Sequence, residues 1–191
     1  MADDNLERQI AFLVEIDGLK SIVRQSPLID RSRRENSAEH SWHLALFALV
    51  LGDSTPEVTP TRVATMLLLH DIVEIDSGDA PIHASHDLEA LALAEKAAAE
   101  RIFGLLPSAQ RDRFLSLWLE FEAGETPDAR FAKALDRLQP LLVNTLTGGG
   151  TWSENGVTED QVCVRYGPTI ERGSPALWTY ARRLVHQHFL P

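Results

Sequence analysis

Four side chains that could together bind a metal ion lie in three separate stretches of the sequence, each with the apolar spacing of a helix. His40 opens one stretch, His70-Asp71 ends the run LLLHD, and Asp136 lies within FAKALDRLQPLLVN. Two imidazoles and two carboxylates suit a borderline divalent ion such as Mn²⁺, Fe²⁺, Co²⁺, Ni²⁺ or Zn²⁺ in a site that keeps open positions. A thiolate-bound structural zinc fits poorly, because the chain has one cysteine.

Each of these residues also has an ordinary structural explanation. His70 and Asp71 could simply end a helix, although the helix dipole favours histidine there and disfavours the aspartate. His40 could be a packing residue on an apolar helix. The neighbours of Asp136 are mostly apolar, so its carboxylate faces the interior, where burial without a cation costs several kcal/mol. That cation is either a metal ion or a side chain, Arg137 or Lys133.

Two acids that follow His70-Asp71 could take part in catalysis. Glu74 lies four residues after His70, so on a continuing helix the two lie on neighbouring faces. A carboxylate beside a metal ion, but not bound to it, can take a proton from water or give one to a leaving alkoxide. Asp79, next to Gly78, is placed to contact a substrate hydroxyl. The alternative for both acids is a solvated acidic turn.

Basic side chains lie on both sides of these motifs. Four arginines precede the first histidine of the set: Arg24, Arg31, Arg33 and Arg34. Arginine binds phosphate in a bidentate manner, and we expect one of the four to face the site and the others to be surface charge. His83 and His86 could hold a second ion, but solvated histidines are the simpler interpretation.

The elements that position these residues are predicted to be helices. Apolar residues recur at helical spacing over residues 6–23, 38–50, 60–70, 88–106, 108–123, 127–147, 158–170 and 175–189. The ranges 25–35 and 75–87 are predicted to be loops, and no strand is expected because no segment alternates in the manner of a strand. The fold class is therefore all-α, a bundle of six to eight helices.

Composition narrows the classes of protein. The chain has 191 residues, of which 44% are hydrophobic and 24% charged, which predicts a single domain over 1–191 with its metal-site core at about 18–144 and the helices of 158–190 packed on it. A net charge of −10 argues against a nucleic-acid polymer as partner. The longest apolar stretch is too short to span a membrane. The lone Cys163 and the acidic, polar N-terminus predict a cytoplasmic protein.

Three segments resemble one family. They are ENSAEHSWHLALFALVL (residues 35–51), LLLHDIVEIDSGDAP (residues 67–81) and FAKALDRLQPLLVN (residues 131–144). Their ordered histidine, His-Asp pair and aspartate resemble the signature of the HD-domain metal-dependent phosphohydrolases. The block EIDSGD makes the chain most similar to the 5′-deoxynucleotidase-type branch. The resemblance runs from about Gly18 to Asn144, and the last residues add little to it.

The resemblance implies a helical HD-domain bundle, a homodimer and a role for each matching residue. The metal ligands it implies are His40, His70, Asp71 and Asp136, with Glu74 catalytic, Asp79 on the sugar and Arg24 on the phosphate. Gln25 departs from the family, because members that prefer deoxyribonucleotides commonly have an aromatic residue after that arginine. The resemblance therefore does not extend to 2′-deoxy selectivity.

The function that these features imply is hydrolysis of a small-molecule phosphomonoester, above all a nucleoside 5′-monophosphate, with one divalent transition metal (Mn, Co, Fe, Ni or Zn). One alternative is another HD-domain chemistry, either a pyrophosphohydrolase of a signalling nucleotide or a di-iron oxygenase. A second alternative is a non-catalytic helical module that binds a nucleotide or a partner protein. Two ions per chain would favour the first alternative, and binding without turnover would favour the second.

Overall fold

A computed structural model describes residues 2–83 and 87–190 of the chain. Its helices and strands are α1 (Ala2–Glu15), β1 (Val23–Pro27), β2 (Arg34–Asn36), α2 (Ser37–Leu51), α3 (Pro60–Leu69), α4 (Glu74–Ser77), α5 (Leu88–Phe103), α6 (Ser108–Ala123), α7 (Pro127–Leu146), α8 (Gly150–Glu154), α9 (Glu159–Gly173) and α10 (Pro175–Phe189). Short 3₁₀ helices span Ile16–Ser21, Gly52–Ser54 and His70–Val73. Within the described ranges eight helices have ten residues or more, which confirms the predicted all-α bundle.

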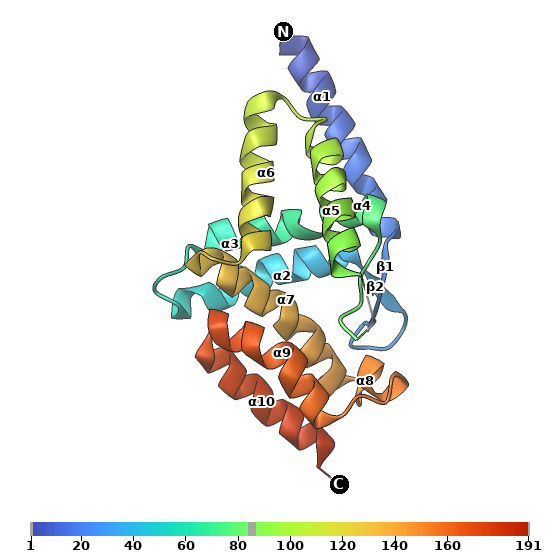
Figure 1. The fold of residues 1–191 in the computed structure, drawn as a ribbon, viewed down its shortest axis with the longest axis vertical. Helices are drawn as coiled ribbons and strands as arrows, with labels where there is room; N and C mark the ends of the chain where they lie inside the picture. Colours follow the sequence, from blue (N-terminus) through green and yellow to red (C-terminus); the bar gives the residue numbers. More distant parts are fainter. Residues whose placement is uncertain (1, 84–86, 191) are drawn as a thin grey trace.

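The long helix α7 lies at the centre of the molecule. It packs against α2, α3 and α6 and against the C-terminal pair α9 and α10. In Figure 1, α7 crosses the middle of the fold, with α5 and α6 above it and α9 and α10 below, while α1 extends upward beside α5. Residues of α7 therefore face several elements at once, and any site built on this helix can draw side chains from distant parts of the sequence.

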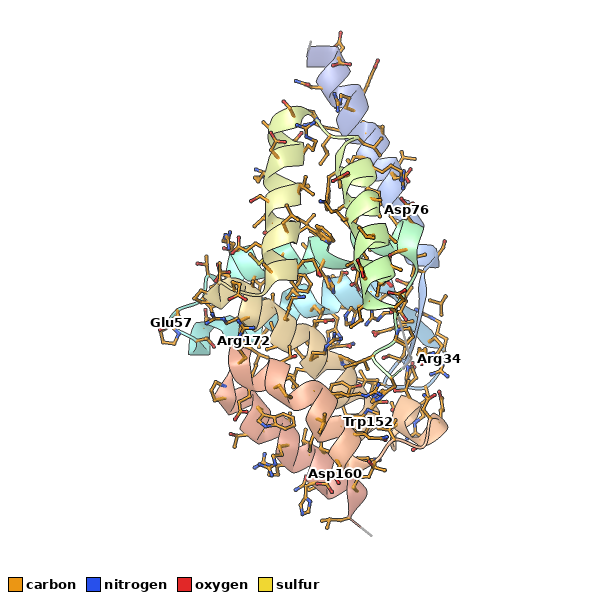
Figure 2. The ribbon with its side chains drawn as sticks, in the orientation of Figure 1. Arg34, Glu57, Asp76, Trp152, Asp160 and Arg172 are labelled. Atoms are coloured by element: carbon orange, nitrogen blue, oxygen red, sulfur yellow. The ribbon has the colours of Figure 1, made fainter. Side chains whose placement is uncertain are left out.

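Two apolar clusters form the core. One gathers around Phe131 and Leu135 of α7 and joins α2, α3, α9 and α10. The other joins α1, α5 and α6 around Phe103 and Trp118. Trp152 of α8, labelled in Figure 2, is 1% exposed and stacks on the ring of Phe189. The last helices thus pack onto the core that carries α7.

Local capping starts the helices that matter most for the site. At the start of α2, the Asn36 side chain accepts the backbone N–H of Glu39 at 2.9 Å, and the Glu39 carboxylate accepts the N–H of Asn36 at 3.1 Å. At the start of α7, Thr126 accepts the backbone N–H of Ala129 at 3.2 Å, and Pro127 occupies the first turn. These caps fix where the two helices begin.

The prediction of a loop over 25–35, and of no strand, is wrong. β1 and β2 form an antiparallel hairpin in which Val23 lies opposite Asn36 and Pro27 lies opposite Arg34. The turn between them places Arg31 at a φ of 59°, which is rare outside glycine. The pair is short and irregular in register, and it packs on α7 and α8, so that tertiary contacts rather than alternation stabilise it. The predicted loop 75–87 also begins inside α4.

No helix within 2–83 and 87–190 is both long and apolar enough to cross a membrane.

Candidate metal and substrate site

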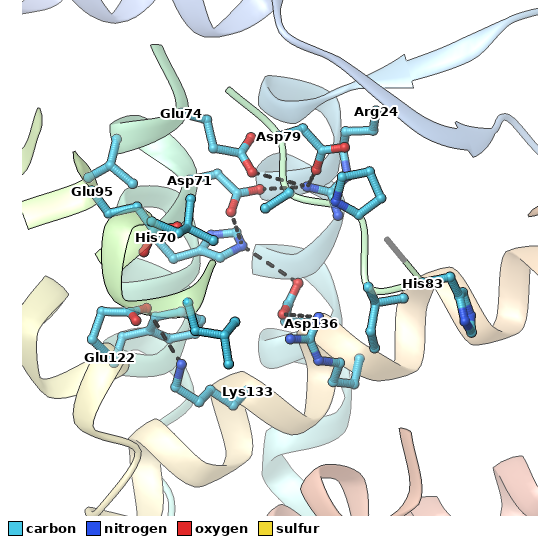
Figure 3. A pocket seen from close by; sticks show the side chains of 18 of the residues that line it. Arg24, His70, Asp71, Glu74, Asp79, His83, Glu95, Glu122, Lys133 and Asp136 are labelled. Atoms are coloured by element: carbon cyan, nitrogen blue, oxygen red, sulfur yellow. Dashed lines mark hydrogen bonds and ion pairs between the residues drawn. The ribbon is translucent and has the colours of Figure 1, made fainter. Parts of the chain in front are cut away.

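Three elements bring the predicted metal ligands together. His40 comes from the first turns of α2, His70 and Asp71 from the 3₁₀ helix after α3, and Asp136 from the middle of α7. His40 Nε2 lies 3.1 Å from Asp136 Oδ1, and His70 Nε2 lies 2.9 Å from Asp71 Oδ1 and 3.7 Å from Asp136 Oδ1. Ligand atoms of His40, His70 and Asp71 all lie within 4.8 Å of one another. Figure 3 shows Asp71 and Asp136 on two sides of the His70 ring.

The hydrogen bonding of His70 fits a metal ligand. Its Nδ1 donates to the carbonyl oxygen of Leu67 at 2.8 Å, and a carbonyl can only accept, so Nδ1 carries a proton and Nε2 is the nitrogen left to bind an ion. Nε2 is buried, makes no hydrogen bond of good geometry with any described residue, and points at the two carboxylates. A histidine fixed in this way by its outer nitrogen is the usual partner of a divalent ion. The residues present therefore fit such an ion.

The electrostatics of the cluster show the same demand for positive charge. Burial favours the neutral imidazole, but Asp71 and Asp136 outweigh it and raise the pKa of His70 to about 10. Burial would also raise the pKa of Asp136, yet the hydrogen bond with His40 and the nearby ring of His70 hold it well below its usual range. The protonated histidine occupies the electrostatic role that a cation would otherwise fill.

The ion pairs weighed for Asp136 are only partly present. Arg137 Nη1 lies 3.6 Å from Asp136 Oδ2, and the Arg137 side chain is 40% exposed. Lys133 turns away, with Nζ 3.5 Å from Glu122 Oε1 and 4.4 Å from the centre of the Phe121 ring. An exposed arginine at that distance contributes little, so it does not account for a carboxylate that is only 16% exposed and also contacts two imidazoles.

Arg24 is the predicted phosphate ligand that faces this cluster. Its side chain is 13% exposed, and Nη1 lies 3.0 Å from Asp71 Oδ2, 3.4 Å from Asp79 Oδ1 and 3.8 Å from Glu74 Oε1. The other three arginines of the set, Arg31, Arg33 and Arg34, line a separate groove of about 460 Å³ beside Gly148. Arg24 therefore brings a fixed positive charge next to the candidate metal ligands.

Glu74 and Asp79 lie beside Arg24 rather than in a solvated turn. Glu74 is 8% exposed, and its Oε2 accepts the Ser37 hydroxyl at 2.5 Å. Burial, reinforced by the charge of Asp71, raises the pKa of Glu74 to about 8. Burial also raises the pKa of Asp79, although Arg24 opposes the shift. A carboxyl group that titrates near neutral pH can both accept and donate a proton under physiological conditions.

A cavity of about 640 Å³ opens onto these residues. Its lining includes the polar side chains of Arg24, Glu74 and Asp79 and the apolar side chains of Pro81, Ile82, Leu88 and Leu91. Arg137 and Arg165 also line the cavity. Figure 3 shows Glu74, Asp79 and Arg24 close together on one side and Lys133 and Glu122 on the other. The volume lies within the range of roughly 300–1,000 Å³ that small-molecule sites occupy.

Among known protein families, the HD domain family matches residues 16–178 of this chain. The chain belongs to the HD domain family. The resemblance inferred from the three motifs is thereby confirmed.

Proteins similar to this chain carry two kinds of name. The human 5′-deoxynucleotidase HDDC2 is 28% identical over 134 residues, which cover 70% of this chain and 65% of that protein. A 5′-deoxynucleotidase of Cronobacter sakazakii is 28% identical over 121 residues, covering 57% of this chain and 59% of that one. The matches thus span about two thirds of these relatives or less. The crystal structure of a predicted metal-dependent phosphohydrolase from Magnetospirillum magnetotacticum MS-1 is 53% identical, with a TM-score of 0.90 over 97% of this chain and 95% of that one.

Gln25 and His83, which the sequence also singled out, lie at the edge of the site. Gln25 lines a small pocket of about 50 Å³ next to the main cavity, together with Asn144 and Tyr166. His83 lines both cavities, and its Nε2 lies 3.2 Å from the hydroxyl of Tyr166. His86 lies outside the described residues. His83 is thus partly buried and has a hydrogen-bond partner of its own, so it is not the solvated histidine that the sequence led us to expect.

Three polar residues that the sequence did not single out also contact the site. Ser37 bonds to Glu74, and the buried Glu35 lies between Arg24, His40 and Gln139. Glu35 is 4% exposed and Gln139 is 1% exposed. The one signal in the sequence was Glu35 itself, an acid immediately before the cap of the helix that carries His40.

Proposed function

We propose that this protein is a metal-dependent phosphomonoester hydrolase that acts on nucleoside 5′-monophosphates. The observation that carries the proposal is the position of Arg24 Nη1, 3.0 Å from Asp71, because it sets a phosphate-binding group beside the candidate metal ligands at the mouth of a cavity. The names of the relatives, 5′-deoxynucleotidase and metal-dependent phosphohydrolase, support it.

Four residues would hold one divalent ion of the group Mn, Co, Fe, Ni and Zn: His40, His70, Asp71 and Asp136. When bound, such an ion supplies positive charge that polarises a phosphoryl oxygen and makes water a better nucleophile. The ion would also satisfy His70 Nε2, which has no hydrogen-bond partner among the described residues.

The protein's own residues divide the remaining work. Arg24 binds the non-bridging oxygens of the phosphate and orients it against the attacking water. Glu74 takes a proton from that water and returns one to the departing 5′-oxygen as the P–O bond breaks, a role suited to a carboxyl group with a pKa of about 8. Asp79 accepts a hydrogen bond from a sugar hydroxyl, and the apolar wall around Ile82 and Leu88 excludes water from one side of the nucleoside.

A screen of phosphate release tests this function. Purified protein is incubated with each ribo- and deoxyribonucleoside 5′-monophosphate and with Mn²⁺, Co²⁺ or Zn²⁺. We expect turnover of at least one monophosphate and a loss of about 100-fold or more in the Glu74→Ala variant, in line with removal of a general acid–base. Asp76→Ala is the matched control, because Asp76 is a nearby acid whose Oδ2 bonds to Arg101 at 2.6 Å on the surface. Wild-type turnover by Glu74→Ala would refute the role of Glu74, and no turnover of any monophosphate would refute the function.

We further propose a homodimer that pairs through the outer face of α2. Trp42, Leu46, Leu49 and Val50 are 41–73% exposed along this face, and an apolar groove of about 680 Å³ lies between α2, α7 and α10. A face of this kind can pair with its own copy across a two-fold axis. Light scattering after gel filtration should give a dimer for the wild type and a monomer for Trp42→Glu; a wild-type monomer would refute it.

We also propose a cytoplasmic location, which the single free cysteine supports. Fractionation of cells that express the tagged protein checks this, and recovery outside the cytosol would contradict it.

A further inference from the structure

Three buried polar atoms without hydrogen bonds meet at one point behind the candidate site. They are Glu35 Oε1, Arg24 Nε and His40 Nδ1. Oε1 lies 3.5 Å from Arg24 Nε and 3.4 Å from His40 Nδ1, just beyond hydrogen-bond length. Buried polar atoms without partners are rare in native proteins. Three that face one another within a few tenths of an ångström of bonding distance indicate an interaction that the bound state completes.

The other oxygen of Glu35 is already anchored. Its Oε2 accepts the side-chain N–H of Gln139, on α7, at 3.1 Å. The carboxylate is 5% exposed, so its charge is costly to bury unless a cation compensates it, and Arg24 is that cation. Glu35, on β2, thus contacts side chains of β1, α2 and α7. Arg24 and His40 use other nitrogen atoms, Nη1 and Nε2, to contact Asp71 and Asp136.

The tautomer of His40 gives this contact a chemical purpose. To bind an ion, His40 must present a lone pair on Nε2, which lies 3.1 Å from Asp136, and its ring proton must then be on Nδ1. Nδ1 becomes a buried donor, and the Glu35 carboxylate is the acceptor in front of it. His70 has the equivalent arrangement with the carbonyl oxygen of Leu67. Glu35 would therefore accept the Nδ1 proton of His40 and orient its ring, as the carbonyl oxygen of Leu67 does for His70.

We propose that Glu35 is a positioning residue, shared through Oε1 by the metal ligand His40 and the phosphate-binding Arg24. It fixes the ring of His40 with Nε2 toward the metal and holds Arg24 with Nη1 toward the substrate. Because one carboxylate oxygen serves both groups, its loss weakens metal binding and phosphate binding together. This proposal rests on the proposed function for the identity of phosphate as the ligand of Arg24. The metal arm of the proposal, the effect of Glu35 on metal affinity, can be measured without any substrate.

The test compares Glu35→Gln with two controls. Glu154→Gln removes an exposed ion pair between α8 and Arg34 of the same hairpin, at 2.8 Å, but touches neither His40 nor Arg24. Gln139→Leu removes the anchor of Glu35 on α7, together with a longer contact of the same amide with His43 Nδ1 at 3.5 Å. Mn²⁺ affinity is measured by competition with a chromophoric chelator, and inorganic phosphate is titrated calorimetrically into the Mn²⁺-loaded protein. Melting temperatures in EDTA report whether each variant is folded.

For Glu35→Gln we expect Mn²⁺ binding to weaken roughly 10- to 100-fold, the usual cost of losing an outer partner of a ligating histidine. Phosphate binding should weaken about tenfold, the cost of one charge-assisted hydrogen bond. Glu154→Gln should change both affinities less than about twofold, because exposed ion pairs contribute little. Should Glu35→Gln not fold, Glu35→Asp keeps the charge but withdraws it, and both affinities should weaken by a smaller factor.

Two results would overturn the proposal. In the first, a folded Glu35→Gln variant binds Mn²⁺ as the wild type does. In the second, Gln139→Leu weakens Mn²⁺ as much as Glu35→Gln, because Glu35 would then act only by holding the hairpin on α7. A wild-type protein that binds Mn²⁺ through these residues but hydrolyses no monophosphate would refute the function while leaving the metal arm of this proposal intact.

Discussion

Replacing Glu74 by glutamine should stabilise the metal-free protein, and by more as the pH rises. Glu74 is 8% exposed, lies beside Asp71, and accepts the hydroxyl of Ser37. Its burial raises the pKa from 4.5 to about 8, so the folded protein holds a proton there that the unfolded chain has already released at neutral pH. Glutamine has nearly the same shape as the protonated acid, keeps an oxygen for Ser37, and cannot ionise.

The sign and size follow from proton linkage. Between pH 4.5 and 8 the folded state binds more protons at Glu74 than the unfolded state, so this residue's contribution to stability is complete below pH 4.5 and is lost as the pH rises toward 8. Each pH unit in that window costs about 1.4 kcal/mol. The pH of 7.5 lies three units above 4.5. Between low pH and pH 7.5, the free energy of unfolding of the wild type should therefore fall by about 4 kcal/mol relative to that of Glu74→Gln.

Urea unfolding in EDTA, followed by far-UV circular dichroism at several pH values from 5 to 8.5, measures the difference between the two proteins. Asp76→Asn is the control, since that exposed acid pairs with Arg101 and its replacement should stay within about 0.5 kcal/mol of the wild type at every pH. A difference between wild type and Glu74→Gln that does not grow with pH, or that favours the wild type at pH 8, would refute the assignment of Glu74 as a buried carboxyl poised to carry a proton.

Three further outcomes are expected. Mn²⁺ at 100 times its Kd should stabilise the wild type by about 2.7 kcal/mol, and Asp71→Asn should lose most of that gain in thermal shift at the same concentration; an unchanged shift would remove Asp71 from the metal site. Arg24→Lys should raise KM for the monophosphate about tenfold with a smaller change in kcat, because lysine cannot make the bidentate contact; steady-state kinetics check this, and an unchanged KM would argue against phosphate binding by Arg24. Ile170→Ala, at a fully buried position of α9, should lower the free energy of unfolding by about 2–5 kcal/mol in urea titrations and leave the Mn²⁺ affinity unchanged, separating core stability from the site.

The helices could be predicted from the sequence because their signals are local. Thr59-Pro60, Thr126-Pro127 and Ser174-Pro175 each combine a capping residue with a first-turn proline, and α3, α7 and α10 begin at these three prolines. The glycine triplet 148–150 likewise comes just after the C-cap of α7, Thr147, with positive φ at all three residues. Such signals depend on a few neighbouring residues and need no knowledge of the rest of the chain.

The hairpin and Glu35 were missed for one shared reason. β2 is three residues long, too short to show alternation, and its pairing depends on β1 and on packing against other elements. In a loop, an acid among four arginines is expected to be solvated, whereas in β2 the middle residue, Glu35, turns inward and is buried. Its partner Gln139 lies 104 residues away in the sequence, and only the fold brings the two together. His40, His70, Asp71 and Asp136 could be predicted as candidate metal ligands from residue type and order alone. The carboxylate proposed to aim His40 is recognisable only once the strand that carries it is known.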